Sequence, residues 1–386
     1  MKKSFLVMSA ILCFLFLTHV EASAQKVVKI GGLFTTSGAA AHLGKTGLNG
    51  TYLAIEEINA KGGITVGGEK YKIELINYDD KCVAKDAVSA TERLIRQDKV
   101  PMIFGAICSH CTLAAMEITE KEKIPILTAI SASMKVTQMG YKYIFRTGAQ
   151  TAIQMETITR FAAEDLKMKT AAYIGRNDAW ARSGADEFKL RFEKRGGKVL
   201  MTEFYELGTT DFYPQLTKAK NANPDFIHIC ALAEDGGLLV KQAQELGIKA
   251  QIIGNDSTAN DLFFRIAGDA SEGMYVFWNG GPTGTKVLEY EKRYKNKYGI
   301  DSIAPDIMCY DALYIMANAL ERAGTVTDGQ RIRDALAKTD FDGIRQRFTF
   351  AENGQAKCEM WMGKIEKRKV KFLKQIPIYD NPPAPL

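Results

Sequence analysis

The segment 108–111, which reads Cys-Ser-His-Cys, carries the side chains best suited to chemistry. It follows an apolar strand-like run over 102–107 and precedes a helical pattern that starts at Leu113. A helix N-terminus presents unpaired backbone N–H groups and the positive end of the macrodipole, so a serine placed there helps to hold a carboxylate. The segment therefore predicts a site for a small anion, with Ser109 as its hydroxyl group.

The two cysteines of this segment suggest different chemistry. A helix start lowers the pKa of a thiol, so Cys108 and Cys111 also match a disulfide-exchange pair. That interpretation requires Cys108 to be an exposed thiol with Cys111 as its partner. Zinc is a third candidate, because these cysteines with His110 and Cys82 are suitable ligands, but they lack the paired spacing of a structural site. Thiol exchange stays as a minor alternative, and we expect no metal.

Motifs of common enzymes are absent from the sequence. It contains no Gly-x-Ser-x-Gly elbow, no Walker phosphate loop and no His-Glu-x-x-His zinc motif. There are four histidines, and one of them is His19 near the start, so general acid-base catalysis has few candidates. We expect a protein with no catalytic residues and no cofactor.

The first 24 residues have the pattern of a secretory signal. Lys2 and Lys3 precede an apolar run over 5–17, which is followed by small residues up to Ala24 and then Gln25. The pattern predicts cleavage between Ala24 and Gln25. No later stretch approaches about 18 uninterrupted apolar residues, so we expect a soluble protein exported to the periplasm.

Length and charge limit the class of protein further. A chain of 386 residues is longer than one ordinary core serves, so two domains are expected. The net charge of +6 is weak and dispersed, which gives no indication of a nucleic-acid partner. The basic run 364–374 alternates with apolar residues and predicts a pair of solvent-exposed edge strands.

Apolar strand-like runs alternate with amphipathic helical runs along most of the chain. This pattern is typical of a doubly wound α/β fold, in which helices cover both faces of a parallel sheet. The alternation restarts after 144–147, so two such lobes are predicted, and the tail 348–376 predicts short antiparallel strands. The expected strands are 27–34, 71–78, 102–107, 124–127, 171–174, 199–205, 226–230, 251–254 and 274–277, and the expected helices are 48–60, 84–97, 113–121, 152–166, 184–195, 213–219, 238–246, 287–298, 306–323 and 330–337.

Two of the seven cysteines follow strands that should be neighbours. Cys82 comes after the run 71–78, and Cys108 comes after the run 102–107. The ends of these strands would lie side by side in a parallel sheet, and an exported protein meets an oxidising compartment. We therefore predict a disulfide between Cys82 and Cys108, whereas Cys230 and Cys309 have the surroundings of buried thiols.

Ligands bind at the carboxyl ends of strands in open parallel sheets. The loops at these ends are rich in Ser, Thr, Asn, Asp and Gly. Two facing sets of such loops describe a cleft that closes on a small ligand. The loops are 35–43, 79–82, 108–111, 128–133, 175–182 and 255–260.

From about Lys26 to the C-terminal hairpin, the chain resembles the periplasmic leucine/isoleucine/valine-binding proteins of ABC importers. The order and spacing of several short segments together carry the resemblance. These segments are 56–64 (Glu-Glu-Ile-Asn-Ala-Lys-Gly-Gly-Ile), 78–82 (Tyr-Asp-Asp-Lys-Cys), 108–109 (Cys-Ser), 143–147 (Tyr-Ile-Phe-Arg-Thr) and 266–274 (Ile-Ala-Gly-Asp-Ala-Ser-Glu-Gly-Met).

The resemblance implies a type I periplasmic binding protein fold, with two α/β lobes that close on the ligand about a hinge. The first lobe would comprise 26–147 and 278–350, and the second 148–277 and 351–386. The implied partners are a small-molecule ligand and the membrane permease of the importer, and the protein is expected to be a monomer.

The resemblance also implies roles for individual residues. Cys82 and Cys108 match the disulfide of the family. Ser109 and the loop 128–133 match the groups that hold the α-carboxylate of the ligand. Asp256 takes the place of an acidic residue that binds the α-ammonium, and Trp180 takes the place of an aromatic residue from the second lobe.

The sequence departs from the family at some of these positions. Ala132 replaces a hydroxyl residue that contacts the ligand, which leaves Ser131 or Ser133 to substitute for it. Leu43 and the pair 232–233 (Leu-Ala) replace aromatic residues, so the pocket is expected to be roomier or more apolar than that of a leucine binder. Branched-chain amino acids are the first expected ligands, followed by aromatic or other small carboxylates, then amides or urea, for transport or for sensing.

Overall fold

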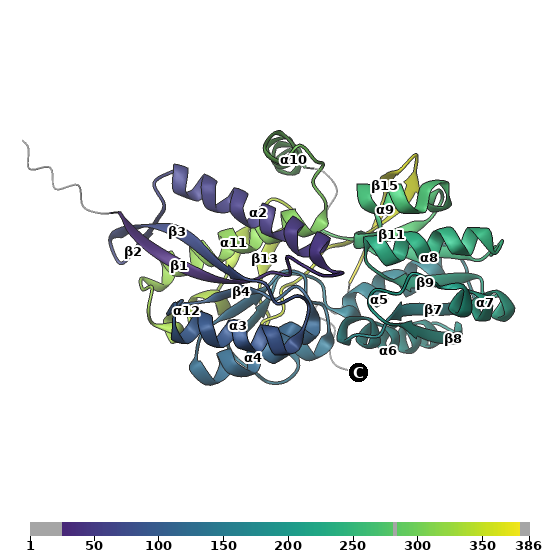
Figure 1. The fold of residues 1–386 in the computed structure, drawn as a ribbon, viewed down its shortest axis with the longest axis horizontal. Coiled ribbons are helices and arrows are strands. Elements are labelled where there is room, and N and C mark those ends of the chain that lie inside the picture. Colours follow the sequence, from purple (N-terminus) through teal and green to yellow (C-terminus); the bar gives the residue numbers. More distant parts are fainter. Residues whose placement is uncertain (1–24, 281–283, 379–386) are drawn as a thin grey trace, which may run out of the picture.

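The computed structural model describes residues 25–280 and 284–378. They form two α/β lobes side by side (Figure 1). The predicted signal segment and its cleavage point after Ala24 lie outside the described residues. No helix in the described ranges is both long enough and apolar enough to cross a membrane.

A six-stranded sheet forms the centre of the first lobe, in the order β2-β3-β1-β4-β5-β6. All neighbours are parallel except β2, which pairs antiparallel with β3. The strands are β1 (Lys26–Leu33), β2 (Ile64–Val66), β3 (Glu69–Tyr78), β4 (Ile103–Gly105), β5 (Ile126–Thr128) and β6 (Ile144–Arg146).

Helices cover both faces of this sheet. One face buries a core with α2, α10, α11 and α12, and the other buries a core with α3 and α4. Three of these helices come from the part of the chain that follows the second lobe. Their bounds are α2 (Ala41–Ala60), α3 (Ala84–Arg96), α4 (Ser109–Glu122), α10 (Thr285–Tyr298), α11 (Ala304–Ala323) and α12 (Gly329–Ala337), with the short η1 (Met134–Thr137) after β5.

The second lobe has a seven-stranded sheet in the order β15-β14-β11-β10-β9-β7-β8. The strands β7 to β11 are parallel, whereas β14 and β15 form an antiparallel hairpin at one edge. The predicted antiparallel pair is present, but only β15 is an edge strand, because β14 lies between β15 and β11 and is largely buried. The strands are β7 (Thr170–Arg176), β8 (Lys198–Tyr205), β9 (Phe226–Cys230), β10 (Gln251–Gly254), β11 (Tyr275–Asn279), β14 (Met360–Glu366) and β15 (Lys369–Ile376), and β12 (Asp340–Asp342) pairs separately with β13 (Arg347–Thr349).

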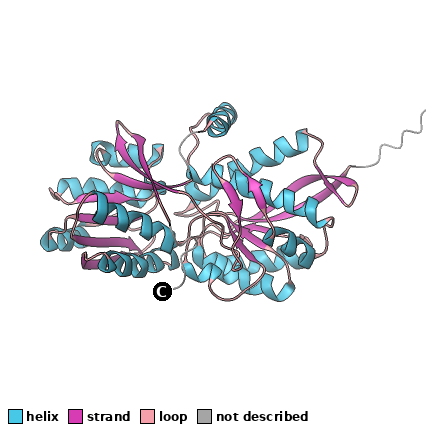
Figure 2. Ribbon diagram, turned by 180° about the vertical axis from the view of Figure 1, so that it is seen from behind, coloured by secondary structure: helices cyan, strands magenta, loops and turns pink. Residues whose placement is uncertain are grey.

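Helices also cover both faces of the second sheet (Figure 2). α5 and α6 pack on one face, and α7, α8 and α9 pack on the other. The predicted fold class, two doubly wound α/β lobes, is therefore confirmed. The helices are α5 (Thr151–Arg160), η2 (Phe161–Asp165), α6 (Ala179–Lys194), α7 (Tyr213–Ala222), α8 (Ala233–Glu245), η3 (Asp256–Thr258), α9 (Asp261–Ala267) and η4 (Gly268–Ser271).

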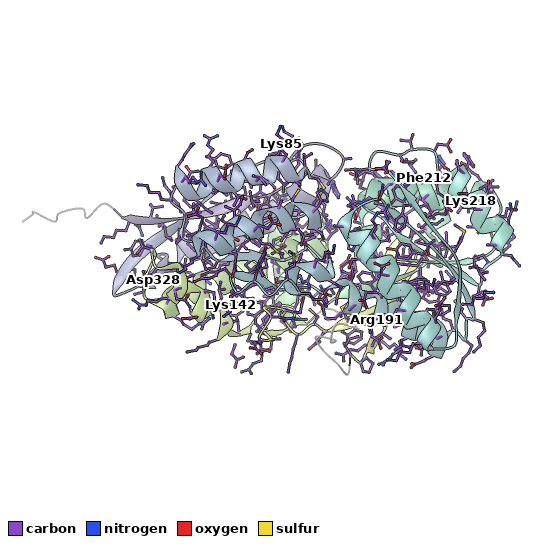
Figure 3. The ribbon with its side chains drawn as sticks, turned by 90° about the horizontal axis from the view of Figure 1, so that it is seen from below. Lys85, Lys142, Arg191, Phe212, Lys218 and Asp328 are labelled. Carbon is purple, nitrogen blue, oxygen red and sulfur yellow. A yellow bond between two sulfur atoms is a disulfide. The ribbon has the colours of Figure 1, made fainter. Side chains whose placement is uncertain are left out.

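Charged side chains are spread over the surface of both lobes. Figure 3 shows this with the exposed side chains of Lys85 and Asp328 on the first lobe and Lys218 on the second. Ion pairs, such as Lys218 with Glu203 at 3.0 Å, join several of these groups. Each exposed ion pair contributes little to the free energy of folding. This dispersed pattern agrees with the weak net charge of the sequence.

The chain passes between the sheets after β6, after β11 and before β14, and the three connections touch one another. The side chain of Gln355 donates from Nε2 to the carbonyl of Gly148 at 2.9 Å, and its Oε1 accepts from Nε of Arg146 at 2.6 Å. The amide of Gly280 donates to the carbonyl of Glu359 at 2.8 Å. Trp278 and Asn279 still lie on β11, so the second sheet extends past 277; the predicted lobe boundaries near 147, 278 and 350 otherwise stay a prediction.

Arg146 is fully buried at the first connection, and its hydrogen-bond acceptors in the described part of the chain are all neutral. Its Nη1 donates to the carbonyls of Ser131 and Ser133, at 3.2 and 2.7 Å. Its Nη2 donates to Thr137 Oγ1 at 2.7 Å and to Gln150 Oε1 at 3.1 Å. Burial lowers the pKa of Arg146 to about 9, which leaves the guanidinium charged at neutral pH. Arg146 thus fixes the loop after β5 to the connection between the lobes.

Several helices start earlier than the sequence indicates. α4 begins at Ser109 rather than Leu113, and α6 begins at Ala179 rather than Gly184. Their first turns contain polar or small residues, so the amphipathic pattern is visible only further along. The side chain of Asp178 caps α6 by accepting from the amides of Trp180 and Ala181. Trp180, expected in a polar loop, is therefore on a helix.

Glycine allows two helices of the first lobe to approach closely. A Cβ atom on Gly50 of α2 would lie 1.9 Å from the carbonyl oxygen of Asp306 on α11. A Cβ atom on Gly47, one turn earlier, would lie 3.0 Å from the sulfur of Cys309. Because the N-terminal end of α11 contributes to the cavity described below, this contact fixes part of the cavity wall.

We expect Gly50→Ala to lower the free energy of unfolding by about 1–3 kcal/mol, the usual cost of overpacking. An alanine in an unobstructed helix would instead stabilise by about 1 kcal/mol, so the sign of the change in urea unfolding is informative. Lys45→Ala, on the exposed side of the same helix, serves as the control and should change stability by no more than about 0.5 kcal/mol. Unchanged or raised stability of Gly50→Ala would contradict the close contact.

Candidate ligand-binding site

A cavity lies between the lobes, where both sheets present the carboxyl ends of their parallel strands. Its empty volume, including solvent at the mouth, is about 610 Å³. Of the predicted site residues, Leu43, Ser109, Ala132, Trp180 and Asp256 all contribute to its wall. The remaining wall consists of Ile107, Cys108, Ile130, Ala149, Gln154, Arg176, Leu232, Ser257, Asn279, Ala304, Pro305 and Met308.

Ser109 is the first residue of α4 and is nearly inaccessible to solvent. Its Oγ accepts hydrogen bonds from the amides of Ala132 and Ser133, both at 3.2 Å. With both amides donating to the oxygen, the hydroxyl proton of Ser109 remains available as a donor. Together with the free amides of the first turn of α4, this proton forms a donor set suited to an anion.

Ser131 and Ser133 differ from the prediction, because their side chains do not belong to the cavity wall. Both residues are buried, and their carbonyls accept from Arg146. The loop therefore contributes at this point through Ala132 and its backbone. A role for the hydroxyls of Ser131 and Ser133 in ligand binding stays a prediction.

Asp256 is a half-buried residue of the second lobe that begins η3, two positions after the end of β10, and it contributes to the cavity wall. Burial raises the pKa of its carboxyl to about 6, although nearby hydrogen bonds and the positive charge of Arg345 act in the other direction. Within the described residues, Asp256 forms no ion pair. A cationic group of a ligand would stabilise its charged form.

Trp180 connects the lobes at the cavity. Its ring packs against the cores of both lobes, and its Nε1 donates to Gln154 Oε1 at 3.2 Å. Close by, the amide of Met134 in the first lobe donates to Ser183 Oγ of α6 in the second lobe at 3.1 Å. Leu232 of the second lobe also packs with the first-lobe core. The lobes are therefore in contact around the cavity.

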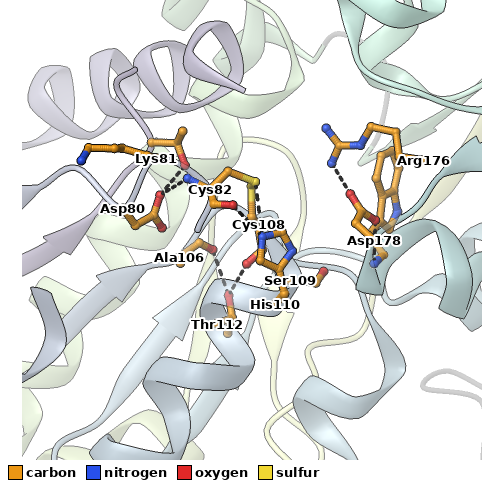
Figure 4. The surroundings of a disulfide bond; sticks show 12 residues. Asp80, Lys81, Cys82, Ala106, Cys108, Ser109, His110, Thr112, Arg176 and Asp178 are labelled. Atoms are coloured by element: carbon orange, nitrogen blue, oxygen red, sulfur yellow. Dashed lines mark hydrogen bonds and ion pairs between the residues drawn. A yellow bond between two sulfur atoms is a disulfide. The ribbon is translucent and has the colours of Figure 1, made fainter. Parts of the chain in front are cut away.

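The predicted disulfide between Cys82 and Cys108 is confirmed, with Cα atoms 5.6 Å apart (Figure 4). The expectation that the two preceding strands are neighbours is wrong, because β1 lies between β3 and β4 and the loops after those strands bring the two cysteines together. Disulfide exchange through Cys108 and Cys111 is consequently wrong, because Cys108 is already bonded elsewhere. Cys111 is buried, and burial together with the negative charge of Asp80 raises its pKa. The zinc alternative loses its ligands for the same reason, since two of its thiols are oxidised.

Four polar residues of the wall were not predicted as site residues, and one of them, Ser257, directly follows the predicted Asp256. Arg176 ends β7 and lies in the loop 175–182, which was expected at the carboxyl end of a strand. A charged residue at such an end could have been predicted as a site residue. Asn279 ends β11, where the sequence predicted a strand end two residues earlier. Gln154 lies inside α5, and nothing in the local sequence distinguishes it from a surface residue of a helix.

A two-lobed α/β fold with a cavity between the lobes defines a class of solute-binding proteins. The sequence pattern described as periplasmic binding protein matches residues 27–369. The chain belongs to this family.

Individual relatives confirm the resemblance drawn from the sequence. The leucine-, isoleucine-, valine-, threonine- and alanine-binding protein of Pseudomonas aeruginosa is 30% identical over 343 residues, which cover 86% of this chain and 88% of that protein. A leucine-binding protein of Thermotoga maritima has a TM-score of 0.83 at 29% identity, covering 91% of this chain and 99% of its own. A solute-binding protein of an ABC transporter from Rhodopseudomonas palustris, in complex with 3,4-dihydroxybenzoic acid, has a TM-score of 0.82 at 25% identity, covering 91% and 97%.

We expect the folded protein to show no thiol reactive toward a disulfide reagent at pH 8, because the cysteines outside the disulfide, Cys111, Cys230, Cys309 and Cys358, are all buried. The test uses protein without residues 1–24. Unfolding in guanidinium should release four reactive thiols, and prior reduction should release two more from Cys82 and Cys108. A rapidly reacting thiol in the native protein would contradict this assignment.

Proposed function

We propose that this protein is the periplasmic solute-binding component of an ABC importer, and that it binds an amino acid or a related small carboxylate between its lobes. The observation that supports this most is the distribution of polar and apolar groups in the cavity wall. Hydrogen-bond donors at the start of α4 and the carboxyl of Asp256 both belong to its wall, and apolar side chains make up much of the rest. A zwitterion with an apolar body matches this distribution of groups.

The carboxylate of the ligand would bind at the start of α4. The hydroxyl of Ser109 donates to it, and the first-turn amides add further donors together with the positive end of the helix dipole. Ala132 and Ser133 orient the serine through their amides. No lysine or arginine is required at this end.

The ammonium group of the ligand would pair with Asp256. A carboxyl whose pKa is about 6 is largely charged at pH 7, and a bound cation would lower that pKa further. The side chain of the ligand would then contact apolar residues such as Leu43, Leu232 and Met308.

Branched-chain amino acids are the first candidates, in line with the names of the relatives from Pseudomonas and Thermotoga. Aromatic or other small carboxylates are second, because leucines take positions expected to be aromatic and because the Rhodopseudomonas relative binds a benzoic acid. Amides or urea are third. Export through the predicted signal segment, a monomeric state and delivery to a membrane permease belong to the same proposal, and a sensory role would use the same cavity.

Ligand-dependent thermal unfolding tests the proposal, after bound ligand has been removed by unfolding and refolding. A ligand at a hundredfold excess over its dissociation constant should add about 2.7 kcal/mol of stability. Aliphatic amino acids, aromatic acids, amides and urea form the panel. An increase in Tm with amino acids or carboxylates is expected, and the absence of any increase across the panel would contradict the proposed function.

Ser109→Ala should weaken binding of the best ligand by about 1–2 kcal/mol, because one hydrogen bond to a charged group is lost. Titration calorimetry would show this as a rise in Kd of about 5- to 30-fold. Ser89→Ala is the matched control, since Ser89 lies on α3 and bonds only to the carbonyl of Lys85. Equal affinities of the two variants would exclude Ser109 from the site.

Binding of ligands with an ammonium group should weaken by up to about tenfold between pH 6 and pH 5. Protonation of Asp256 near pH 6 removes the charge that pairs with the ammonium, so affinity falls as pH falls. Asp256→Asn should abolish this dependence and bind such ligands poorly at pH 7. The control is Asp269→Asn, whose carboxylate is 95% exposed at the surface, and a pH dependence that survives in Asp256→Asn would remove Asp256 from the ammonium site.

A further inference from the structure

Arg176 brings a cationic group to the cavity, from the lobe opposite Ser109. It is the last residue of β7, is 4% exposed and contributes to the cavity wall. Figure 4 shows the Arg176 side chain across from the segment that contains Cys108, Ser109 and His110. The proposed functions of Ser109 and Asp256 make no use of it.

The guanidinium is held in place on one side only. Its Nη2 pairs with Asp178 Oδ2 at 2.5 Å, and its Cζ lies 5.6 Å from the centre of the Trp180 ring. Asp178 is itself fixed, because its Oδ1 accepts from the amides of Trp180 and Ala181. The orientation of Arg176 is therefore set before any ligand arrives.

Two donor atoms of Arg176 remain unsatisfied. Nε and Nη1 are buried, and neither has a hydrogen-bond partner in the described part of the chain. Buried donors of a charged group that lack an acceptor are costly, and an oxygen atom that reaches them gains a charge-assisted hydrogen bond. A purely hydrocarbon group in the same place would leave these donors without an acceptor and gain nothing from the charge.

The acidic residues nearby do not provide that acceptor. Asp178 is already paired with Nη2, and the Oδ2 of Asp235 accepts from the hydroxyl of Tyr205 at 2.8 Å. Arg176 ends β7 in the second lobe, whereas Ser109 begins α4 in the first. A ligand whose carboxylate binds at Ser109 would therefore meet Arg176 with a different part of the molecule.

We propose that the natural ligand is bifunctional: one carboxylate binds at Ser109, and a second oxygen acceptor on the rest of the molecule binds Nε or Nη1 of Arg176. This rests on the proposed function and refines its ligand class. The class comprises small acids that carry a hydroxyl, carbonyl or second carboxylate oxygen away from the first carboxyl group. Arg176 is a specificity-determining residue that discriminates between such acids and their hydrocarbon analogues.

Matched ligands test the proposal. Benzoate is compared with 4-hydroxybenzoate and terephthalate, and norleucine with 2-aminoadipate, each by titration against the refolded wild-type protein. In at least one series the member with the distal oxygen should bind at least about tenfold more tightly than its hydrocarbon analogue, the scale of one charge-assisted hydrogen bond. The hydroxyl and carboxylate members separate a neutral acceptor from an anionic one.

Arg176→Gln should reduce that preference to near unity while leaving the affinity of the hydrocarbon member within about threefold. Arg176→Lys, which keeps the charge but has a shorter reach, should retain part of the preference. Arg182→Gln is the matched control, because Arg182 bonds to Asn177 and stacks on Phe204 outside the cavity wall. Its preference should equal that of the wild type.

The outcomes separate this inference from the function on which it rests. Wild-type protein that binds the acids but shows no preference in either series would overturn the inference alone. A preference that persists in Arg176→Gln would overturn it too. If no acid binds at all, both fail together. The wild-type comparison needs no variant, so a variant that does not fold leaves the inference testable.

Discussion

The buried guanidinium of Arg146 is the interaction on which the arrangement of the site depends. A charge with no carboxylate partner among the described residues is tolerated because its donors are distributed over neutral acceptors. These acceptors belong to the loop after β5 and to the connections between the lobes. The loop supplies the two amides that orient Ser109. The position of the Ser109 hydroxyl is therefore fixed from the connection between the lobes as well as from α4.

The fold could be predicted from the sequence because long alternating patterns determine it. The strand-like runs before Cys82 and Cys108 were clear enough to predict a disulfide, which is present. The starts of helices were not predicted well. The first turns of α4 and α6 depend on caps and tertiary contacts, which leave little trace in hydrophobic periodicity. Trp180 was thus assigned to the cavity correctly but to a loop wrongly.

The site divides in a similar way. Ser109 and Asp256 follow strands and could be found by asking where strands end. The absence of Ser131 and Ser133 from the cavity wall could not be predicted, because it depends on the hydrogen bonds that their carbonyls accept from Arg146. Arg176 is an intermediate case. Its position at a strand end was visible, but its two unsatisfied donor atoms become apparent only in three dimensions.

Residues 131–134 make three kinds of contact within four positions. They bind Arg146 of the hinge, they hold Ser109, and the amide of Met134 reaches Ser183 of the other lobe. A disturbance at any one of these contacts is therefore transmitted to the other two through a single short stretch of backbone. A substitution here therefore affects the contact between the lobes as well as the orientation of Ser109.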